Sequence, residues 1–124
     1  MIPDSVLVVD ADPVVLDLLS REGSRRGVDF VGAQSIEEVD KVLGTRPFGV
    51  AVVNLRLGPL SGLDVIKRVR DKDPSTEAIV ISADRRLSSA LDSYAHNVFA
   101  FVPKPFDPEE LVATVAGLAA EAPV

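Results

Sequence analysis

Short apolar runs alternate with longer segments of helical period along the whole chain, and this alternation limits the possible folds more than any other feature. Most of the runs are rich in Val and Ile, and several are apolar throughout, as strands buried on both faces are. They lie at Val6–Val9, Asp29–Gly32, Val50–Val53, Ala78–Ser82 and Phe99–Val102. The pattern predicts an α/β domain with five parallel strands, in which right-handed crossovers place helices on both faces of the sheet.

The segments between the runs carry signals for helix starts. Matches to N-cap patterns occur at Asp12-Pro13, at Ser35 followed by Glu38, and at Asp107-Pro108 followed by Glu110. The apolar positions at helical spacing, which we expect to face the core, are Val15, Leu18 and Leu19, then Ile36, Val39 and Val42 or Leu43, then Val65, Ile66 and Val69, and finally Leu111, Val115 and Leu118. Gly23 falls inside the first helix, where glycine costs about 1 kcal/mol relative to alanine, and the sequence gives no reason for it.

Length and composition exclude several classes of protein. The 124 residues fit one domain, which we expect to span residues 1–124, and leave no room for a two-domain enzyme. Cysteine is absent, so disulfides, thiolate nucleophiles and Cys-based zinc sites are impossible, and a cytoplasmic location is expected. A net charge of -6 disfavours binding to nucleic acid. No apolar stretch approaches the roughly 20 residues that cross a bilayer, so we expect no membrane segment.

Four polar residues follow or close the predicted strands. Asp10 comes after the first strand, Asn54 after the third, Ser82 closes the fourth and Lys104 comes after the fifth. Parallel strands present their carboxyl ends at one edge of the sheet, so we expect these four side chains to converge in a crevice there. No Gly-rich phosphate loop follows any strand, which argues against a small nucleotide-binding enzyme on the same topology.

The motifs around these positions resemble those of a known family. They are, in order, Val8-Val9-Asp10-Ala11-Asp12-Pro13, Asn54-Leu55-Arg56-Leu57, Ser82-Ala83 and Lys104-Pro105-Phe106. In order and spacing they resemble the motifs of response-regulator receiver domains, over nearly the whole chain. The resemblance implies a flavodoxin/CheY-like (βα)5 fold with strand order 2-1-3-4-5. It also implies a signalling module of a two-component phosphorelay rather than an enzyme.

The resemblance assigns roles to the residues at the strand ends. In the family, two adjacent acids after the first strand and an aspartate after the third hold Mg²⁺, and that aspartate receives a phosphoryl group from a histidine kinase or phosphotransfer protein. Carboxylates suit this chemistry because Mg²⁺ prefers oxygen ligands and phosphoryl transfer depends on positioning and charge neutralisation. By resemblance, Ser82 and Lys104 bind the phosphoryl oxygens and Phe101 is the aromatic switch residue. The bond before Pro105 is cis in the family and directs Lys104 into the pocket.

The sequence departs from the family at the metal and acceptor positions. Ala11 replaces the second acid, and Asn54, whose amide is uncharged and a poor nucleophile, replaces the phospho-acceptor. Asp10 and Lys104 sum to zero charge, whereas three acids and one lysine leave about two negative charges for a divalent ion. We therefore expect weak or absent Mg²⁺ binding and no other cofactor. The family usually has Pro four residues after the acceptor, where this chain has Gly58 with Pro59 following, so the loop geometry is expected to differ.

These departures predict an atypical, phosphorylation-independent receiver, or pseudo-receiver, whose output rests on protein contacts. One alternative is a phosphorylatable receiver in which an engineered Asn54 replaces Asp, although Ala11 would then stay unexplained. The other is a small flavodoxin-like nucleotide-binding enzyme. Whether the chain stands alone or is part of a longer regulator is open at this point.

Two further expectations concern contacts. A buried Lys104 without a phosphoryl partner should pair with Asp10 or bond to the Asn54 carbonyl. Partners, which include a histidine kinase, an effector domain or a second receiver in a homodimer, are expected on the face of the fourth helix, fifth strand and fifth helix. The residues that motivate this choice are Tyr94, Val98 and Phe99 and the alanines of the fifth helix, Ala113, Ala116, Ala119 and Ala120.

Overall fold

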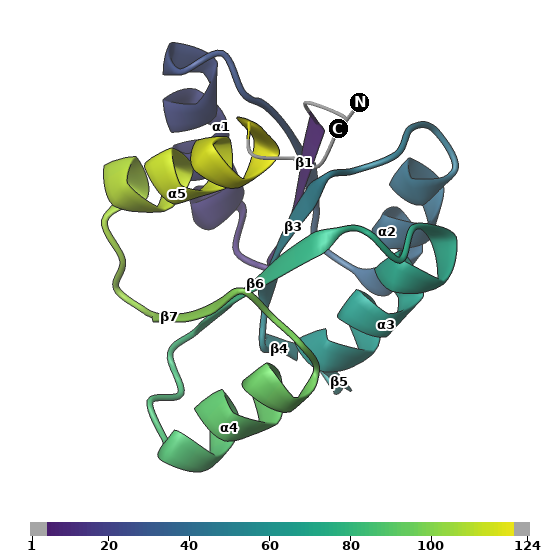
Figure 1. Cartoon of the computed structure of the whole chain (residues 1–124), viewed down its shortest axis with the longest axis vertical. Helices are drawn as coiled ribbons and strands as arrows, with labels where there is room; N and C mark the ends of the chain where they lie inside the picture. The colour runs from purple at the N-terminus through teal and green to yellow at the C-terminus, as the bar shows by residue number, and fades with distance from the viewer. Residues whose placement is uncertain (1–4, 121–124) are drawn as a thin grey trace.

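The computed structural model describes residues 5–120, which form a five-stranded parallel sheet with helices on both faces (Figure 1). The strands are β1 (Ser5–Val9), β2 (Asp29–Ala33), β3 (Val50–Asn54), β6 (Glu77–Ser82) and β7 (Ala100–Pro103). Their order across the sheet is β2-β1-β3-β6-β7, and every neighbouring pair is parallel. The predicted order 2-1-3-4-5 is confirmed when the strands of this sheet alone are counted.

A short antiparallel hairpin, β4 (Arg56–Leu57) and β5 (Leu60–Ser61), follows β3 and is not predicted by the sequence pattern. Two-residue strands are too short to show a period. The turn between them consists of Gly58 and Pro59, and Gly58 has a φ of 61°. Because the proline ring fixes φ near about −65°, proline is incompatible with this conformation at position 58, whereas glycine adopts it without strain.

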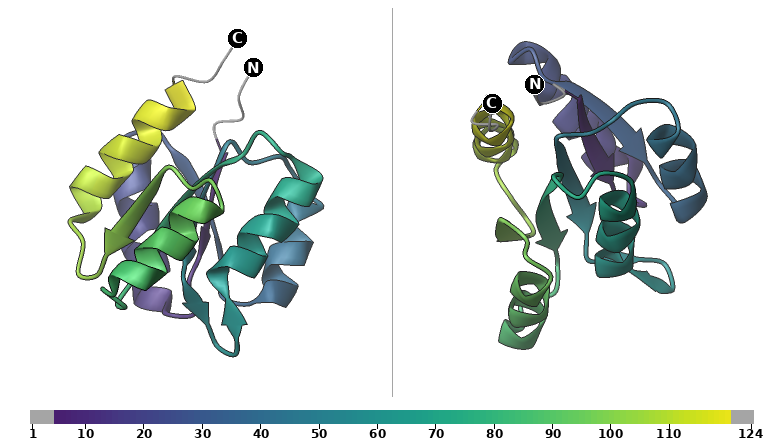
Figure 2. Two further views of the ribbon diagram at one scale, coloured as in Figure 1. Left: turned by 60° about the horizontal axis from the view of Figure 1, so that its bottom comes forward. Right: turned by 45° about the vertical axis from the view of Figure 1, so that its right-hand side comes forward.

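Within residues 5–120, five helices connect the strands: α1 (Pro13–Arg25), α2 (Ile36–Leu43), α3 (Gly62–Lys72), α4 (Leu87–Ala95) and α5 (Pro108–Ala120). Helices α1 and α5 lie side by side over one face of the sheet, and α2 and α3 lie side by side over the other, as Figures 1 and 2 show. Helix α4 packs beside β7 at the edge of the sheet. In this part of the chain, no helix is long and apolar enough to cross a membrane.

The central strand β3 divides its side chains between two cores. Val53 packs into the core under α2 and α3, and Val52 packs into the core under α1 and α5. The predicted core positions that are buried are Val15, Leu19, Val39, Val65, Ile66, Val69, Leu111 and Val115, and those that are partly buried against a core are Ile36, Val42, Leu43 and Leu118. The arrangement confirms the alternation of apolar strands and amphipathic helices.

Two burial predictions are wrong. Leu18 is 45% exposed, because consecutive helical residues are about 100° apart and a neighbour of the buried Leu19 lies at the margin of the core face. Val98 is only 7% exposed and belongs to the core under α2 and α3, so it is not available to a partner. It lies between the end of α4 and β7, where the chain turns inward to enter the sheet.

The predicted helix starts are confirmed by side-chain bonds. The Asp12 carboxylate accepts the Val14 N–H at 2.9 Å, and the Ser35 hydroxyl accepts the Glu38 N–H at 3.2 Å. At the start of α5, the Asp107 carboxylate accepts the Glu109 N–H at 3.0 Å. Each bond satisfies an N–H group that has no partner within its own helix.

Gly23 permits a close contact that the sequence does not reveal. A Cβ atom at this position would collide with the ring of Phe30 in β2. Glycine therefore lets α1 and β2 approach closely, at the cost in helix propensity noted above.

Candidate functional site

Three of the four polar residues at the strand ends, Asp10, Asn54 and Lys104, bring their side chains together. The Lys104 ammonium is 2.8 Å from Asp10 Oδ2, and Asn54 Nδ2 donates to Asp10 Oδ1 at 3.2 Å. Ser82 joins this group through its carbonyl, which accepts the Lys104 backbone N–H at 2.7 Å. The ion pair expected between Lys104 and Asp10 is therefore present at the carboxyl edge of the sheet.

Both carboxylate oxygens of Asp10 have donors from the protein itself. Asp10 is 1% exposed, and its Oδ1 also accepts the backbone N–H of Asp12 at 2.9 Å. A buried carboxylate is tolerated only when it is paired and hydrogen-bonded, and Lys104, Asn54 and the Asp12 N–H together meet this requirement. Asp10 and Lys104 together carry no net charge.

Few oxygen ligands surround Asp10. Ala11 contributes no side-chain oxygen, and the Asp12 carboxylate caps α1 by accepting the Val14 N–H. Across residues 5–120, no group of three or more His, Cys, Asp or Glu side chains is placed to hold a metal ion. The carboxylate that faces Asn54 and Lys104 is that of Asp10 alone.

Ser82 connects the pocket to the loop that follows β6. Its side chain is buried, and its hydroxyl oxygen accepts the backbone N–H of Asp84 at 2.9 Å. Its carbonyl accepts the Lys104 N–H from the end of β7. Ser82 is thus held from two sides by backbone donors, one on each of two loops.

Phe101 and Pro105 lie at the two sides of the pocket. Phe101 is partly buried against the core under α2 and α3, and its backbone N–H makes a long 3.4 Å bond to the Tyr94 hydroxyl of α4. The Lys104-Pro105 bond is cis. Pro105 also lines a mainly apolar hollow of about 430 Å³, together with Lys104 and Leu18 of α1.

Asp84 is a functional candidate that the sequence reasoning missed. Its carboxylate accepts the Arg86 backbone N–H at 3.0 Å, the Arg86 guanidinium at 2.7 to 3.1 Å and the Ser89 hydroxyl at 2.7 Å. Arg56 of β4 approaches the same carboxylate at 3.7 Å. Hydrogen bonds from the Arg86 side chain, then from Ser89 and the Arg86 N–H, hold the pKa of Asp84 well below its usual range. The same pairing raises the pKa of Arg86.

Gly62 fixes how closely α3 approaches Asn54. Its N–H donates to the Leu55 carbonyl at 2.6 Å, and a Cβ atom at position 62 would collide with the Asn54 carbonyl. The first residue of α3 therefore has room for glycine only, and the Asn54 backbone is enclosed by it.

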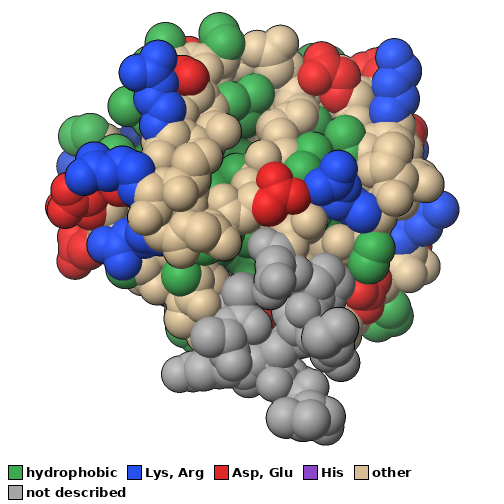
Figure 3. Space-filling model, turned by 90° about the horizontal axis from the view of Figure 1, so that it is seen from above, with side chains coloured by type: hydrophobic (Ala, Val, Ile, Leu, Met, Phe, Trp, Pro, Cys, Tyr) green, Lys and Arg blue, Asp and Glu red, His purple; other side chains and the backbone are tan. Residues whose placement is uncertain are grey.

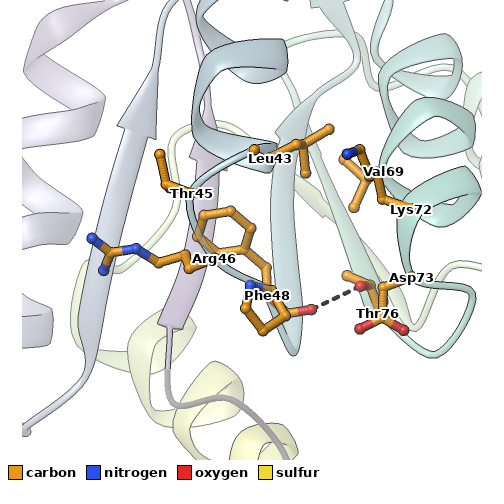
Figure 4. Close-up of a pocket in the computed structure, with 10 residues that line it drawn as sticks. Leu43, Thr45, Arg46, Phe48, Val69, Lys72, Asp73 and Thr76 are labelled. Atoms are coloured by element: carbon orange, nitrogen blue, oxygen red, sulfur yellow. Dashed lines mark hydrogen bonds between the residues drawn. The ribbon is translucent and has the colours of Figure 1, made fainter.

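A second hollow, of about 350 Å³, lies at the other end of the sheet (Figure 4). Leu43 of α2 and Val69 of α3 line it together with the buried Phe48. The Thr76 hydroxyl donates to the Phe48 carbonyl at 2.7 Å, which satisfies this buried group. None of the strand-end residues borders this hollow, so it is separate from the site at the carboxyl edge.

The five-stranded parallel fold, with its site at the carboxyl edge of the sheet, is the one expected of a receiver domain. Sequence comparison identifies the family. A family model for the response regulator receiver domain matches residues 6–116. The chain therefore belongs to the response regulator receiver domains, the CheY-like modules of two-component systems.

Individual relatives extend this finding. The chain is 33% identical over 125 residues to the response regulator protein PilR of Pseudomonas aeruginosa, a match covering 95% of this chain and 28% of PilR. It is 34% identical over 114 residues to the acid tolerance regulatory protein ActR of Sinorhizobium medicae, covering 91% of this chain and 59% of ActR. The chain thus spans less than two thirds of either relative.

A solved structure confirms the fold. A two-component response regulator from Clostridium difficile superimposes with a TM-score of 0.86 at 17% identity, over 94% of this chain and 96% of that one. Similarity at this low identity concerns the fold and not the chemistry of the pocket.

Proposed function

We propose that this chain is an atypical receiver that acts through protein contacts and is not switched by phosphorylation at its acceptor position. One observation carries the proposal. Asn54 stands at that position and its amide donates to Asp10, whose other oxygen pairs with Lys104. The three side chains thus satisfy one another without a bound ion or phosphoryl group.

The chemistry of Asn54 supports this proposal. The lone pair of the amide nitrogen is delocalised and the amide oxygen is uncharged, so neither atom attacks phosphorus as a carboxylate does. Lys104, which the family resemblance assigns to the phosphoryl oxygens, is engaged with Asp10 at 2.8 Å. A phosphoryl group entering the pocket would therefore have to displace a charge-assisted bond.

The residues present do not fit a Mg²⁺ ion. Magnesium demands near-octahedral oxygen coordination at about 2.0–2.1 Å. Ala11 offers no oxygen, and Asp10 would have to give up Lys104 or Asn54 to become a ligand. We infer weak or absent Mg²⁺ binding, and the proposed function includes no metal step.

Intact mass spectrometry after treatment with Mg²⁺ and acetyl phosphate tests the proposal. The samples are wild type, Asn54→Asp, Ala11→Asp and the double variant. We expect wild type and Ala11→Asp to stay unmodified, because both lack the nucleophile. Asn54→Asp should gain a phosphoryl group slowly, and the double variant faster, because Ser82 and Lys104 already occupy the phosphoryl-binding positions.

Each other result has a distinct meaning. A phosphoryl adduct on an aspartate of wild type contradicts the proposal. An Asn54→Asp variant as reactive as the double variant favours the alternative in which position 54 alone separates this chain from a phosphorylatable receiver. A double variant that stays inert shows that the Gly58-Pro59 turn or another difference also disables the site.

We infer that a protein partner binds the exposed apolar side chains of α4 and of the residue directly before β7. This α4 surface consists of Leu87, Leu91, Tyr94 and Phe99, which are 74%, 59%, 51% and 51% exposed. Leu87, Leu91 and Tyr94 are spaced by four and three residues, so they share one side of the helix. Large apolar side chains gathered on one exposed side mark interaction sites. On α5, Ala113 is exposed, while the side chains of Ala119 and Ala120 lie outside those that the structure describes.

Sedimentation of the wild type over a range of concentrations tests a second copy of the chain as the partner. Leu91→Asp should reduce self-association without unfolding the domain, because the side chain is exposed. Val14→Asp is the matched control, since Val14 is 61% exposed on α1, away from α4. A wild type that sediments as a monomer contradicts the homodimer, and the same two variants then test a histidine kinase or effector domain.

The charge distribution supports a protein partner rather than nucleic acid. The chain carries a net charge of -6. On the face seen from the top of Figure 1, basic side chains lie among acidic and apolar ones (Figure 3). Phosphate-backbone binding depends on clustered positive charge. We therefore infer no nucleic-acid binding by this domain.

A further inference from the structure

The Asp84 carboxylate is an anion enclosed by donors in the loop between β6 and α4. Its side chain is 12% exposed, whereas those of Arg56 and Arg86, which approach it, are 71% and 66% exposed. Arg86 wraps around it with both its side chain and its backbone N–H, and Ser89 reaches it from the first turn of α4. The carboxylate thus holds the residue before α4 and a residue within α4 at the same time.

Helix α4 has no side-chain cap of its own, and the Asp84 carboxylate lies beside its N-terminus. Arg86 occupies the N-cap position and makes no side-chain capping bond, and the first turn of α4 contains no acidic residue. Helix N-termini have unpaired N–H groups and favour a nearby negative charge. Asp84, two residues before the N-cap residue, supplies both the acceptor for the Arg86 N–H and the charge.

Asp84 is also joined to the pocket by two routes. Its backbone N–H donates to the Ser82 hydroxyl at 2.9 Å, and Ser82 accepts the Lys104 N–H through its carbonyl. The second route is Arg56, which follows Asn54 by two residues and approaches the Asp84 carboxylate at 3.7 Å. The same residue therefore contacts the pocket on one side and α4 on the other.

We propose that Asp84 is a built-in anionic latch that holds the β6–α4 loop and the first turn of α4 in one arrangement, so that the α4 surface is presented without any phosphoryl group. The regulatory meaning of the latch rests on the proposed function, because a fixed α4 surface matters only if partners bind it. The latch itself rests on the contacts of Asp84. The negative charge of Asp84 belongs to the chain itself, so, unlike a phosphoryl group, it is not added and removed.

Hydrogen exchange of backbone amides, measured without a partner or phosphoryl donor, tests the latch. The informative amides are those of Ser89 and Ala90, whose N–H groups bond to the Arg86 carbonyl at 3.1 and 3.3 Å. Asp84→Asn keeps the size of the side chain and removes its charge. We expect these two amides to exchange about tenfold faster in this variant, because the turn opens more readily once the charge-assisted bonds to Asp84 are lost.

Asp92→Asn is the matched control, because Asp92 is an exposed aspartate on α4 that forms no side-chain ion pair or hydrogen bond among residues 5–120. It changes the net charge equally and should alter the exchange of Ser89 and Ala90 by less than about twofold. The amides of Val52 and Val53 in β3 report on global opening. They should not change in Asp92→Asn, and in Asp84→Asn they should exchange faster only by the amount that the loss of unfolding free energy accounts for.

Unchanged exchange of Ser89 and Ala90 in Asp84→Asn would overturn the latch. Arg86→Gln and Ser89→Ala test the same contacts from the side of the donors. Each should loosen the first turn of α4 alone, and together with Asp84→Asn their effects should be less than additive. Fully additive effects would also overturn the latch. Phosphorylation of wild type contradicts the proposed function and leaves this result unaffected, so the two failures are distinguishable.

Discussion

Asp10 and Asp84 are both shielded carboxylates, but their partners have opposite consequences. Asp10 faces inward, where Lys104 and Asn54 consume its hydrogen-bonding capacity and close the pocket. Asp84 faces the loop before α4, where Arg86 and Ser89 convert its charge into a fixed loop conformation. At the scale of single residues, Asp10 accounts for the contacts within the pocket, and Asp84 accounts for those of the loop before α4.

Removing Lys104 should be costly. In Lys104→Met the Asp10 carboxylate stays buried without its cation, so we expect the free energy of unfolding to fall by about 3 kcal/mol. Adding Asp10→Asn should restore part of the loss, because no unpaired charge is then buried. Urea unfolding of wild type, both single variants and the double variant measures the coupling. Additive losses would contradict a direct interaction between the two side chains.

Asp84 should contribute to stability in a pH-dependent manner. Its pKa is lower in the folded protein than the ordinary value of 3.8, so its ionised form stabilises the fold above that pH. The contribution declines as the pH falls below the ordinary value toward the folded pKa. The groups that face it are Arg56 of β4, Arg86 and the uncharged Ser89, and both arginines stay charged throughout. The difference in unfolding free energy between wild type and Asp84→Asn should therefore shrink between about pH 6 and about pH 3.

A difference that is constant over this range would show that Asp84 has no shifted pKa. Asp92→Asn is again the suitable control, because its exposed carboxylate forms no ion pair among the described residues. It changes the net charge equally and leaves the contacts of Asp84 in place.

Sequence alone predicts the pocket better than the loop. Asp10, Asn54, Ser82 and Lys104 could be placed together because each is adjacent to a strand, and parallel strands bring their carboxyl ends to one edge. Asp84 lies in a loop without a periodic pattern. The two arginines that follow it, Arg85 and Arg86, are typical of a solvated basic pair. Its role depends on the side-chain conformations of Arg86 and Ser89, which no local pattern encodes.

At the scale of elements, the hairpin β4–β5 and helix α4 show two limits of periodicity. The hairpin has strands of two residues each and leaves no alternating pattern. Helix α4 has apolar residues at helical spacing, a pattern that is the same for a core face and for an interface. Leu87 and Leu91 are exposed here because α4 directs Ser89 and Ser93 inward instead.

Gly62 provides a test of how tightly α3 packs against the end of β3. Gly62→Ala should lower the free energy of unfolding by more than about 2 kcal/mol, because the Cβ would collide with the rigid Asn54 carbonyl. Gly117→Ala in α5 is the control. Among the described residues, no atom outside the neighbouring residues and the backbone of its own helix lies within 4 Å of a Cβ at position 117, so this variant should be stabilised by about 0.5–1 kcal/mol through helix propensity alone. A Gly62→Ala variant with the same free energy of unfolding as wild type would show that the backbone around Asn54 can shift.

At the scale of the whole molecule, one sheet supports both cores, so the described residues should unfold as a unit. Val52 and Val53 are fully buried neighbours on β3 that face opposite layers. Val52→Ala and Val53→Ala should each lower the free energy of unfolding by about 2 kcal/mol and leave a single transition. Far-ultraviolet circular dichroism and Tyr94 fluorescence should report the same midpoint. Separate midpoints would show that the layers unfold independently.

The ion pair between Asp10 and Lys104 has a consequence for how such a module conveys information. On the proposed function, a pocket whose side chains pair with one another does not register whether phosphoryl donors are abundant or scarce. The α4 surface is then equally available at all times, and occupancy by a partner follows mass action. What the cell can vary is the number of copies, so this receiver should behave as a dose-dependent component whose synthesis and degradation set its output.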